Sequence, residues 1–287
     1  MNKSSTSTES IYVDIEISFI QQLRLIHALS ESDFEIIVSD KDAPKLTLLR
    51  EKFDMDFKTG HHQGLPLSEF TEIHHKKTPA TIVGDIHRIL VFPHAIVNYC
   101  HSLWNEDRAY RYTFAGLMTK ARKAVITGWV KRNTTAKRAR LNNADSFINR
   151  VKKKLYHTLN IDDSVYRHLG DLTIWSSTRG RKYPKKAWDD EYYKFLANSE
   201  FVLCPSGNSV WSYRFFESIL CGAIPIVEES CPAYEGFRYY YMDDDARKLK
   251  WTQEDAAHNY ALCLKRNTIS IDEMNNELRS ELKSQLS

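Results

Sequence analysis

One stretch of the chain, residues 201–227, constrains the fold more than any other. It opens with a short apolar run, 201–204, of the kind that a buried parallel strand needs. A turn follows, with four residues that tolerate bent backbone: Pro205, Gly207, Asn208 and Ser209. Ser212 is suited to cap a helix, and Gly222 to end it before the next apolar run, 224–227. The stretch therefore predicts strand, helix and strand, the repeating unit of a parallel α/β sheet.

The predicted helix carries two charged side chains on the side opposite its apolar residues. Arg214 lies in the first turn and Glu217 one turn later. A helix that starts after a glycine loop attracts anions, and a guanidinium adds paired donors for phosphate oxygens. A carboxylate can accept two hydrogen bonds from vicinal hydroxyls such as those of a ribose. We expect a nucleoside diphosphate here, with its diphosphate on residues 207–212 and Arg214 and its ribose on Glu217. The alternative is an ordinary βαβ unit with a solvated Arg–Glu pair.

These residues resemble the signature of the exostosin-like glycosyltransferases. In that family a strand with Phe, Cys and Leu leads into Pro-x-Gly, followed by Ser-x-Arg-x-x-Glu and by Gly-x-Ile-Pro-Val. The corresponding residues here are Phe201 to Leu203 with Cys204 and Pro205, then Gly207, Ser212, Arg214 and Glu217, and finally Gly222, Ile224, Pro225 and Ile226. Cys204 stands one place later than the family's cysteine. Tyr192 to Ser199 also fits the family's tyrosine–helix–serine lead-in.

The resemblance implies a GT-B-like α/β fold, in which two Rossmann-like domains face a cleft and a C-terminal helix crosses back to the first domain. A length of 287 residues suits two domains of ordinary size. We expect a disordered tail over 1–10, an acceptor-binding domain over 11–107, a nucleotide-sugar-binding domain over 108–268 and the C-terminal helix over 269–287.

Strand and helix patterns alternate elsewhere in the chain. In the first domain, residues 19–29 have helical spacing, and residues 34–38, 80–83 and 88–92 have the composition of strands. The second domain begins with a strand over 111–116 and a helix over 119–131, which resemble the family's strand, glycine turn and helix with an early arginine, here Arg122. This predicts Gly116 beside the donor.

A further strand, 172–175, precedes a polar, basic loop. Ligands of open α/β sheets bind beyond the carboxyl ends of the strands, so Arg179 or Arg181 in this loop can contact the base or a phosphate. The alternative is an exposed surface loop.

Composition excludes several functional classes. A formal charge of +3 is too mild to indicate nucleic acid or an anionic membrane as a partner. The basic segment 131–154 is expected to be a solvated face, and binding of an anionic acceptor or polymer is the alternative. Five scattered cysteines indicate reduced thiols in the cytoplasm. No signal peptide or long apolar run occurs, whereas the family's eukaryotic members are membrane-anchored, so we expect a cytoplasmic protein of a microbe or a virus.

Sugar transfer also needs a base that takes the proton of the acceptor hydroxyl. The family is inverting, which implies a base across the cleft, in the first domain. Residues 84–94 are similar to the family's Gly-x-Asp-His segment, with Asp85 one place early, so Asp85 and then His87 are the expected catalytic residues. His94 and the loop histidines His61 and His62 are expected to bind the acceptor.

A run of three aspartates, 243–245, raises a different possibility. Carboxylates of this kind hold a divalent metal and the donor in GT-A transferases. We instead expect no metal and no cofactor, and transfer of xylose, galactose or glucuronate from a UDP-sugar to a hydroxyl of a glycan or glycoprotein. A metal-dependent GT-A transferase and a non-enzymatic glycan- or polyanion-binding protein are the alternatives.

Overall fold

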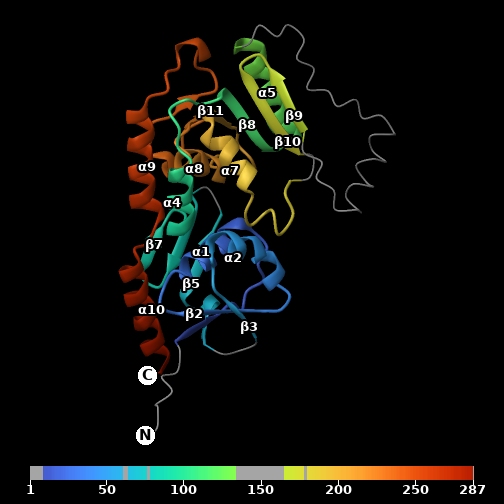
Figure 1. The fold of residues 1–287 in the computed structure, drawn as a ribbon. Coiled ribbons are helices and arrows are strands. Elements are labelled where there is room, and N and C mark those ends of the chain that lie inside the picture. The colour runs from blue at the N-terminus through green and yellow to red at the C-terminus, as the bar shows by residue number, and fades with distance from the viewer. Residues whose placement is uncertain (1–8, 61–63, 76–77, 134–164, 178–179, 287) are drawn as a thin grey trace, which may run out of the picture. The chain divides into compact units, whose positions relative to one another are not determined.

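The computed structural model describes residues 9–60, 64–75, 78–133, 165–177 and 180–286 (Figure 1). Contacts divide the chain into two compact units. Unit 1 comprises Met1–Ser102, Lys182–Asp190 and Ala261–Ser287, and unit 2 comprises Leu103–Arg181 and Glu191–Tyr260. By these contacts, residues 182–190 and 261–268 belong to unit 1, whereas the sequence placed them in the second domain. Residues 103–107 belong to unit 2, whereas the sequence placed them in the first domain.

Unit 1 contains a parallel sheet in the strand order β3-β2-β1-β4. Its strands are β1 (Ser10–Tyr12), β2 (Glu35–Val38), β3 (Lys58–Thr59) and β4 (Leu65–Pro66). Between the strands lie α1 (Ile20–Leu29), η1 (Ala43–Lys45) and α2 (Thr47–Phe53). Ile11 pairs with Ile36 on one side and with Leu65 on the other, and all three are buried. This is the strand order of one half of a Rossmann fold with its next strand, as predicted for the first domain.

A second sheet of unit 1 is antiparallel, and the sequence did not predict it. Its strands are β5 (Thr71–His74), β6 (Ala80–Val83) and β7 (Ile86–Arg88), in that order, preceded by α3 (Leu67–Phe70) and followed by α4 (His94–Ser102). Of the strand expected over 88–92, only Arg88 lies in a strand, as the last residue of β7, so this prediction is wrong for 89–92. Gly84, at φ +52°, allows a turn tight enough for β6 and β7 to pair as neighbours.

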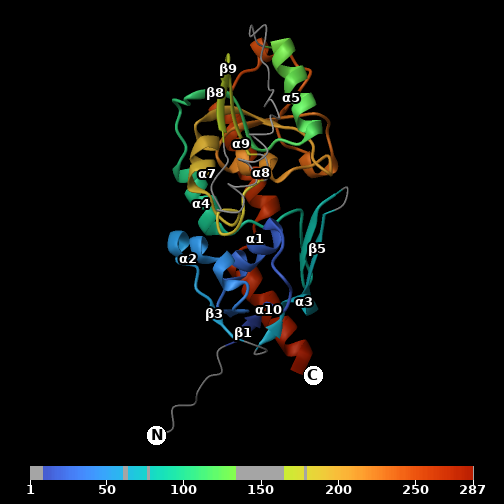
Figure 2. The same cartoon turned by 90° about the vertical axis from the view of Figure 1, so that its right-hand side faces the viewer.

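The last helix, α10 (Ile271–Leu286), packs within unit 1, as predicted (Figure 2). Arg88 donates to both carboxylate oxygens of Glu273, at 2.8 and 2.7 Å. The Asp33 N–H donates to the Asn275 side chain at 2.8 Å. The preceding helix is α9 (Gln253–Asn267). Within the described ranges, no helix combines the length and the apolar character that crossing a bilayer requires.

Unit 2 contains a six-stranded sheet in the order β13-β12-β11-β8-β10-β9. Its strands are β8 (Tyr110–Leu117), β9 (Val165–Leu169), β10 (Leu172–Ser177), β11 (Ser199–Cys204), β12 (Ile224–Val227) and β13 (Tyr240–Tyr241). Its helical elements are α5 (Lys120–Asn133), α7 (Asp190–Ala197), α8 (Tyr213–Leu220), η2 (Pro232–Tyr234) and η3 (Ala246–Lys248). All strand pairs are parallel except β9 with β10. The α/β class predicted for both domains is therefore confirmed.

Strand order reverses at β8, which is the first strand of unit 2. The chain moves from β8 to β10 on one side, and then returns past β8 to β11 and β12 on the other. Because such crossovers are right-handed, the reversal puts α5 on one face of the sheet and α7 and α8 on the other. Trp129 of α5 packs in a buried cluster with Tyr112 and Phe114 of β8. The loops after β8 and β11 consequently diverge at the carboxyl edge of the sheet.

Candidate functional site

The predicted donor residues of unit 2 meet where the loops after β8 and β11 diverge. Arg214, in the first turn of α8, is 7% exposed, and its Nε donates to the carbonyl oxygen of Ala115 in β8 at 2.5 Å. Its guanidinium carbon lies 4.6 Å from the Phe114 ring centroid. Gly116 has φ +135°, and a β-carbon there would lie 2.4 Å from Arg214 Nη2. The glycine therefore leaves the space into which the arginine extends.

A second arginine reaches the same loops from the other side of the reversal. Arg122, in the first turn of α5, donates to the carbonyl oxygens of Leu117 at 3.2 Å and Ser206 at 3.3 Å. A β-carbon on Gly207 would lie 2.8 Å from Arg122 Nη2. Burial first, and the positive charge of Arg214 second, lower the pKa of the Arg122 guanidinium to about 10. Two like charges thus share a partly buried site, which favours an anionic ligand.

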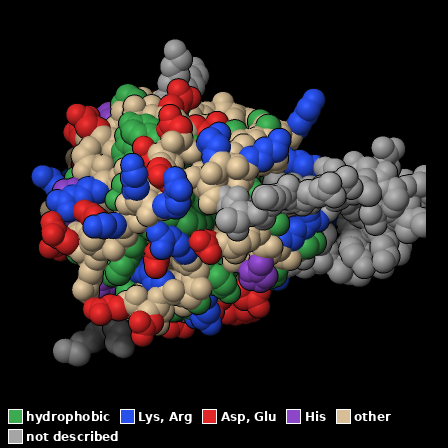
Figure 3. Space-filling model, turned by 90° about the horizontal axis from the view of Figure 1, so that it is seen from above, with side chains coloured by type: hydrophobic (Ala, Val, Ile, Leu, Met, Phe, Trp, Pro, Cys, Tyr) green, Lys and Arg blue, Asp and Glu red, His purple; other side chains and the backbone are tan. Residues whose placement is uncertain are grey.

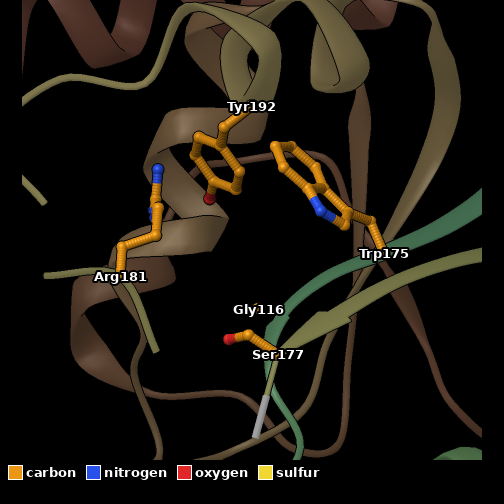
Figure 4. A pocket seen from close by; sticks show the side chains of 5 residues that line it. All are labelled: Gly116, Trp175, Ser177, Arg181 and Tyr192. Atoms are coloured by element: carbon orange, nitrogen blue, oxygen red, sulfur yellow. The ribbon is translucent and has the colours of Figure 1, made fainter. Parts of the chain in front are cut away.

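A pocket adjoins this pair of arginines through Gly116 (Figure 4). It is lined by Gly116, Trp175, Ser177, Arg181 and Tyr192. Trp175 and Ser177 come from the end of β10, Arg181 from the loop that follows, and Tyr192 from α7. The guanidinium carbon of Arg181 lies 4.0 Å from the Tyr192 ring centroid. Aromatic walls with polar groups at the mouth are typical of sites for planar ligands.

Glu217 of α8 is buried behind the pocket, at 5% exposure. Its two carboxylate oxygens accept hydrogen bonds from Tyr192 Oη at 2.7 Å and Tyr193 Oη at 3.0 Å. Burial first, and the carboxylate of Glu217 second, raise the pKa of Tyr192 well above its usual value, so this hydroxyl keeps its proton. The alternative of a solvated Arg214–Glu217 pair is wrong, because both side chains are buried.

The loop between β11 and α8 is open in its first half and anchored in its second. Gly207 and Asn208 are exposed, Ser209 is half-buried, and the Gly207 N–H donates to the Ser209 carbonyl at 3.1 Å. Ser212 occupies the N-cap position of α8, as predicted, but its hydroxyl caps no N–H of the helix. The Phe215 N–H instead donates to the Ser212 carbonyl oxygen at 3.2 Å. Gly222, at φ +72°, ends the helix as expected.

The residues predicted to act on the acceptor lie in unit 1. Asp85 is exposed in the turn between β6 and β7, and its N–H donates to Glu277 of α10 at 2.6 Å. His87 is exposed on β7. His94 begins α4, and its Nε2 lies 2.8 Å from the Ile269 carbonyl oxygen. These contacts anchor the backbone and the His94 ring, and the roles of the three residues in transfer stay predictions.

Several predicted positions fall outside the described residues. They are Arg179, His61, His62 and most of the basic segment 131–154. Arg181, which was predicted as the alternative to Arg179, lines the pocket.

Two of the three aspartates at 243–245 make local contacts. The Asp244 carboxylate accepts the Tyr241 N–H at 2.8 Å, and Asp245 caps η3 and pairs with Arg247 at 2.9 Å. Among the described residues, no three carboxylate, imidazole or thiol side chains are grouped as metal ligands.

On the face shown in Figure 3, described basic and acidic side chains are interspersed.

Sequence reasoning missed Trp175, Ser177 and Tyr192 as lining residues. A signal for Trp175 and Ser177 was present. Trp175 was placed at the carboxyl end of a predicted strand and Ser177 in the loop after it, where ligands of parallel sheets bind. Tyr192 was marked only by the resemblance of 192–199 to the family's lead-in, and its place in the pocket depends on contacts of α7 with β10 and α8.

Comparison with known proteins relates the chain to several glycosyltransferases. It is 31% identical over 81 residues to the "Exostosin-1 homolog" of Caenorhabditis elegans, covering 27% of this chain and 21% of that protein. It is 34% identical over 73 residues to the "Probable glucuronoxylan glucuronosyltransferase IRX7" of Arabidopsis thaliana, covering 25% and 16%. The matched parts thus span about a fifth of the length of these relatives.

Among solved structures, the Anabaena protein HepE in complex with UDP-glucose aligns with a TM-score of 0.35 and 10% identity, over 96% of this chain and 72% of that one. The sequence model of the Exostosin GT47 domain matches residues 81–234. This match runs from β6 to η2, covers more than half of the 287 residues and includes both arginines and both glycines of the site. The chain belongs to the exostosin GT47 family.

Proposed function

We propose that the chain is a glycosyltransferase that inverts the anomeric centre, needs no metal and takes its sugar from a UDP-sugar. One observation carries the proposal: Arg122 and Arg214 converge on Gly207 and Gly116 at the point where the strand order of unit 2 reverses. Breakage of the bond between the anomeric carbon and the diphosphate leaves negative charge on the diphosphate. Two guanidiniums at that position would stabilise the charge without a cation.

The remaining roles follow from the order of groups in a nucleoside diphosphate sugar. The exposed loop residues Gly207 and Asn208 extend the proposed diphosphate site. The ribose is proposed to contact Glu217, whose two carboxylate oxygens also accept hydrogen bonds from Tyr192 and Tyr193. The acceptor hydroxyl attacks the anomeric carbon and loses its proton to Asp85 or His87. Xylose, galactose and glucuronate are the donor sugars proposed, and the name of the Arabidopsis relative adds weight to glucuronate.

Binding of UDP, measured by calorimetry, tests the diphosphate site. Each charge-assisted hydrogen bond contributes about 1.5–3 kcal/mol, so Arg122→Gln should weaken UDP binding roughly ten- to a hundredfold. Lys131→Gln is the matched control, because it removes one exposed positive charge from the last turn of the same helix. Equal affinities of the two variants would refute the placement of the diphosphate.

Turnover tests the rest of the proposal. Hydrolysis of the UDP-sugar donor should persist in EDTA, and its loss would favour the metal-dependent alternative. Asp85→Asn should keep UDP affinity but abolish transfer, and full transfer by this variant would direct attention to His87. Glu217→Ala should weaken UDP binding severely, whereas unchanged affinity would remove the ribose contact from the proposal.

A further inference from the structure

We propose that Tyr192 selects the base of the donor, by accepting a hydrogen bond from the imide N–H of a uracil ring whose edge enters the pocket beside Gly116. This rests on the proposed function, because it takes the diphosphate to lie at Arg122 and Arg214. Gly116 connects the two sites: it lines the pocket, and a β-carbon on it would lie 2.4 Å from Arg214 Nη2. A nucleoside with its phosphates on the arginines therefore has its base within reach of the pocket.

The direction of hydrogen bonding at Tyr192 is set by Glu217. Tyr192 Oη donates its proton to Glu217 Oε2 at 2.7 Å, and a carboxylate can only accept. Toward the pocket, the hydroxyl therefore presents lone pairs and acts as an acceptor. Tyr193 Oη donates to the other carboxylate oxygen at 3.0 Å, which holds Glu217 in place. Glu217 is 5% exposed, and the low local dielectric strengthens these bonds, so the direction at Tyr192 persists.

Two other residues that line the pocket, Ser177 and Arg181, can donate hydrogen bonds. The Ser177 oxygen accepts the Gly180 N–H at 3.1 Å, so its own proton can turn to the pocket. Arg181, 4.0 Å from the Tyr192 ring centroid, carries only donors. The lining therefore combines an acceptor at Tyr192 with donors at Ser177 and Arg181, whose side chains are labelled in Figure 4. The imide edge of uracil, carbonyl, N–H and carbonyl, is its complement. Cytosine places a ring nitrogen lone pair at the N–H position, opposite the lone pairs of Tyr192.

An aromatic wall sets the plane of the base. Trp175 lines the pocket at 7% exposure, and its ring stacks on Tyr166, with centroids 5.3 Å apart and planes inclined by 11°. The two residues face each other across β9 and β10, so the strand register holds the stack in place. A planar base with its edge on Tyr192 therefore lies against a rigid apolar surface.

Tyr192→Phe tests this inference, with Tyr193→Phe as its matched control. Both variants remove one phenol that donates to Glu217, but only Tyr192 lines the pocket. Calorimetry with UDP and CDP gives the readout. A site built to bond an N–H rejects a ligand that lacks it, so wild type should prefer UDP by about tenfold or more. Tyr192→Phe should lose this preference mainly through weaker UDP binding, and Tyr193→Phe should keep it.

Four outcomes would overturn the inference. The first is equal affinity of the wild type for UDP and CDP, and the second is an unchanged preference for UDP in Tyr192→Phe. The third is a parallel loss of both affinities in both variants. The fourth is a Tyr192→Phe effect confined to UDP-sugars, which would place the sugar in the pocket. The proposed function survives all four. It fails separately, and the inference with it, if wild type binds neither nucleotide or if Arg122→Gln binds UDP like wild type. Thermal unfolding of both tyrosine variants confirms that they are folded.

Discussion

Acid should destabilise unit 1 through His27, a histidine buried in α1. Its side chain is 1% exposed, its ring centroid lies 5.4 Å from that of Phe53, and within the described part of the chain its Nδ1 has no hydrogen-bond partner. Burial first, and the charge of Arg24 second, lower its pKa from 6.5 to about 3. A proton on the imidazole would have to be buried beside a guanidinium, so the folded unit keeps this ring neutral at pH values where the unfolded chain protonates it.

The sign and size of the effect follow from linkage. Because the folded pKa is depressed, the contribution to stability is complete above pH 6.5 and is lost as the pH falls from there toward 3. At 1.36 kcal/mol per unit, the free energy of unfolding should drop by about 2 kcal/mol between pH 8 and pH 5. Below pH 3 the loss should approach about 5 kcal/mol, a large part of the stability of a domain.

Urea unfolding at pH 8 and pH 5 measures this loss. Replacing His27 by Leu removes the titrating group, so the difference between the two pH values should shrink by about 2 kcal/mol relative to wild type. His101→Leu, at an exposed position of α4, is the control and should leave the difference as it is in wild type. If His27→Leu and wild type lose the same stability between pH 8 and pH 5, the assignment of a buried, neutral His27 is wrong.

Two further predictions concern unit 2. Gly116→Ala forces a β-carbon to 2.4 Å from Arg214 Nη2 at a positive φ, which costs about 1–3 kcal/mol. Calorimetry should show UDP affinity at least tenfold lower in this variant, and a smaller effect of the same substitution when Arg214 is already replaced by Gln. Additive losses would contradict the contact. Arg108→Met should destabilise unit 2 by roughly 3 kcal/mol in urea unfolding, because its Nη1 donates to three carbonyl oxygens at 2.8 to 3.2 Å. Arg132→Met, at an exposed residue that loses a single bond to the Met242 carbonyl oxygen, should cost under 1 kcal/mol, and similar losses in both variants would refute the role of Arg108.

Local signals in the sequence were enough to predict the unit around α8. The apolar runs, the turn residues and Gly222 act through neighbours in the chain, and the structure has β11, α8 and β12 where they were expected. The same holds for α10. The antiparallel sheet of unit 1 could not be predicted in this way, because a short strand shows the same composition in either kind of sheet. The setting of Asp85 was equally hidden, since Glu277 is 192 residues away along the chain.

The limits of sequence reasoning at the site itself are clearest at Glu217. A helical projection separates it correctly from the apolar face of α8, and a charged face is ordinarily solvated. Here α7 covers that face, and its two tyrosines supply the hydrogen bonds that a buried carboxylate requires. The burial of Glu217 depends on the packing of α7 against α8. The sequence of α8 alone does not indicate which element covers its charged face.

Two glycines and two arginines form the proposed anion site of unit 2, where the strand order reverses. Each glycine lies beside the arginine of the other segment. Gly116 is the next-to-last residue of β8, yet the side chain that fills the space beside it is Arg214, which follows β11. Gly207 follows β11, yet Arg122, which follows β8, lies beside it. Each loop therefore leaves room for the arginine of the other, and both guanidiniums bond to carbonyl oxygens of the opposite loop or strand. Neither segment can form the site alone. The cationic pair exists only where β8 and β11 are neighbours, which explains why glycines separated by ninety-one positions (207 − 116) contribute to one site.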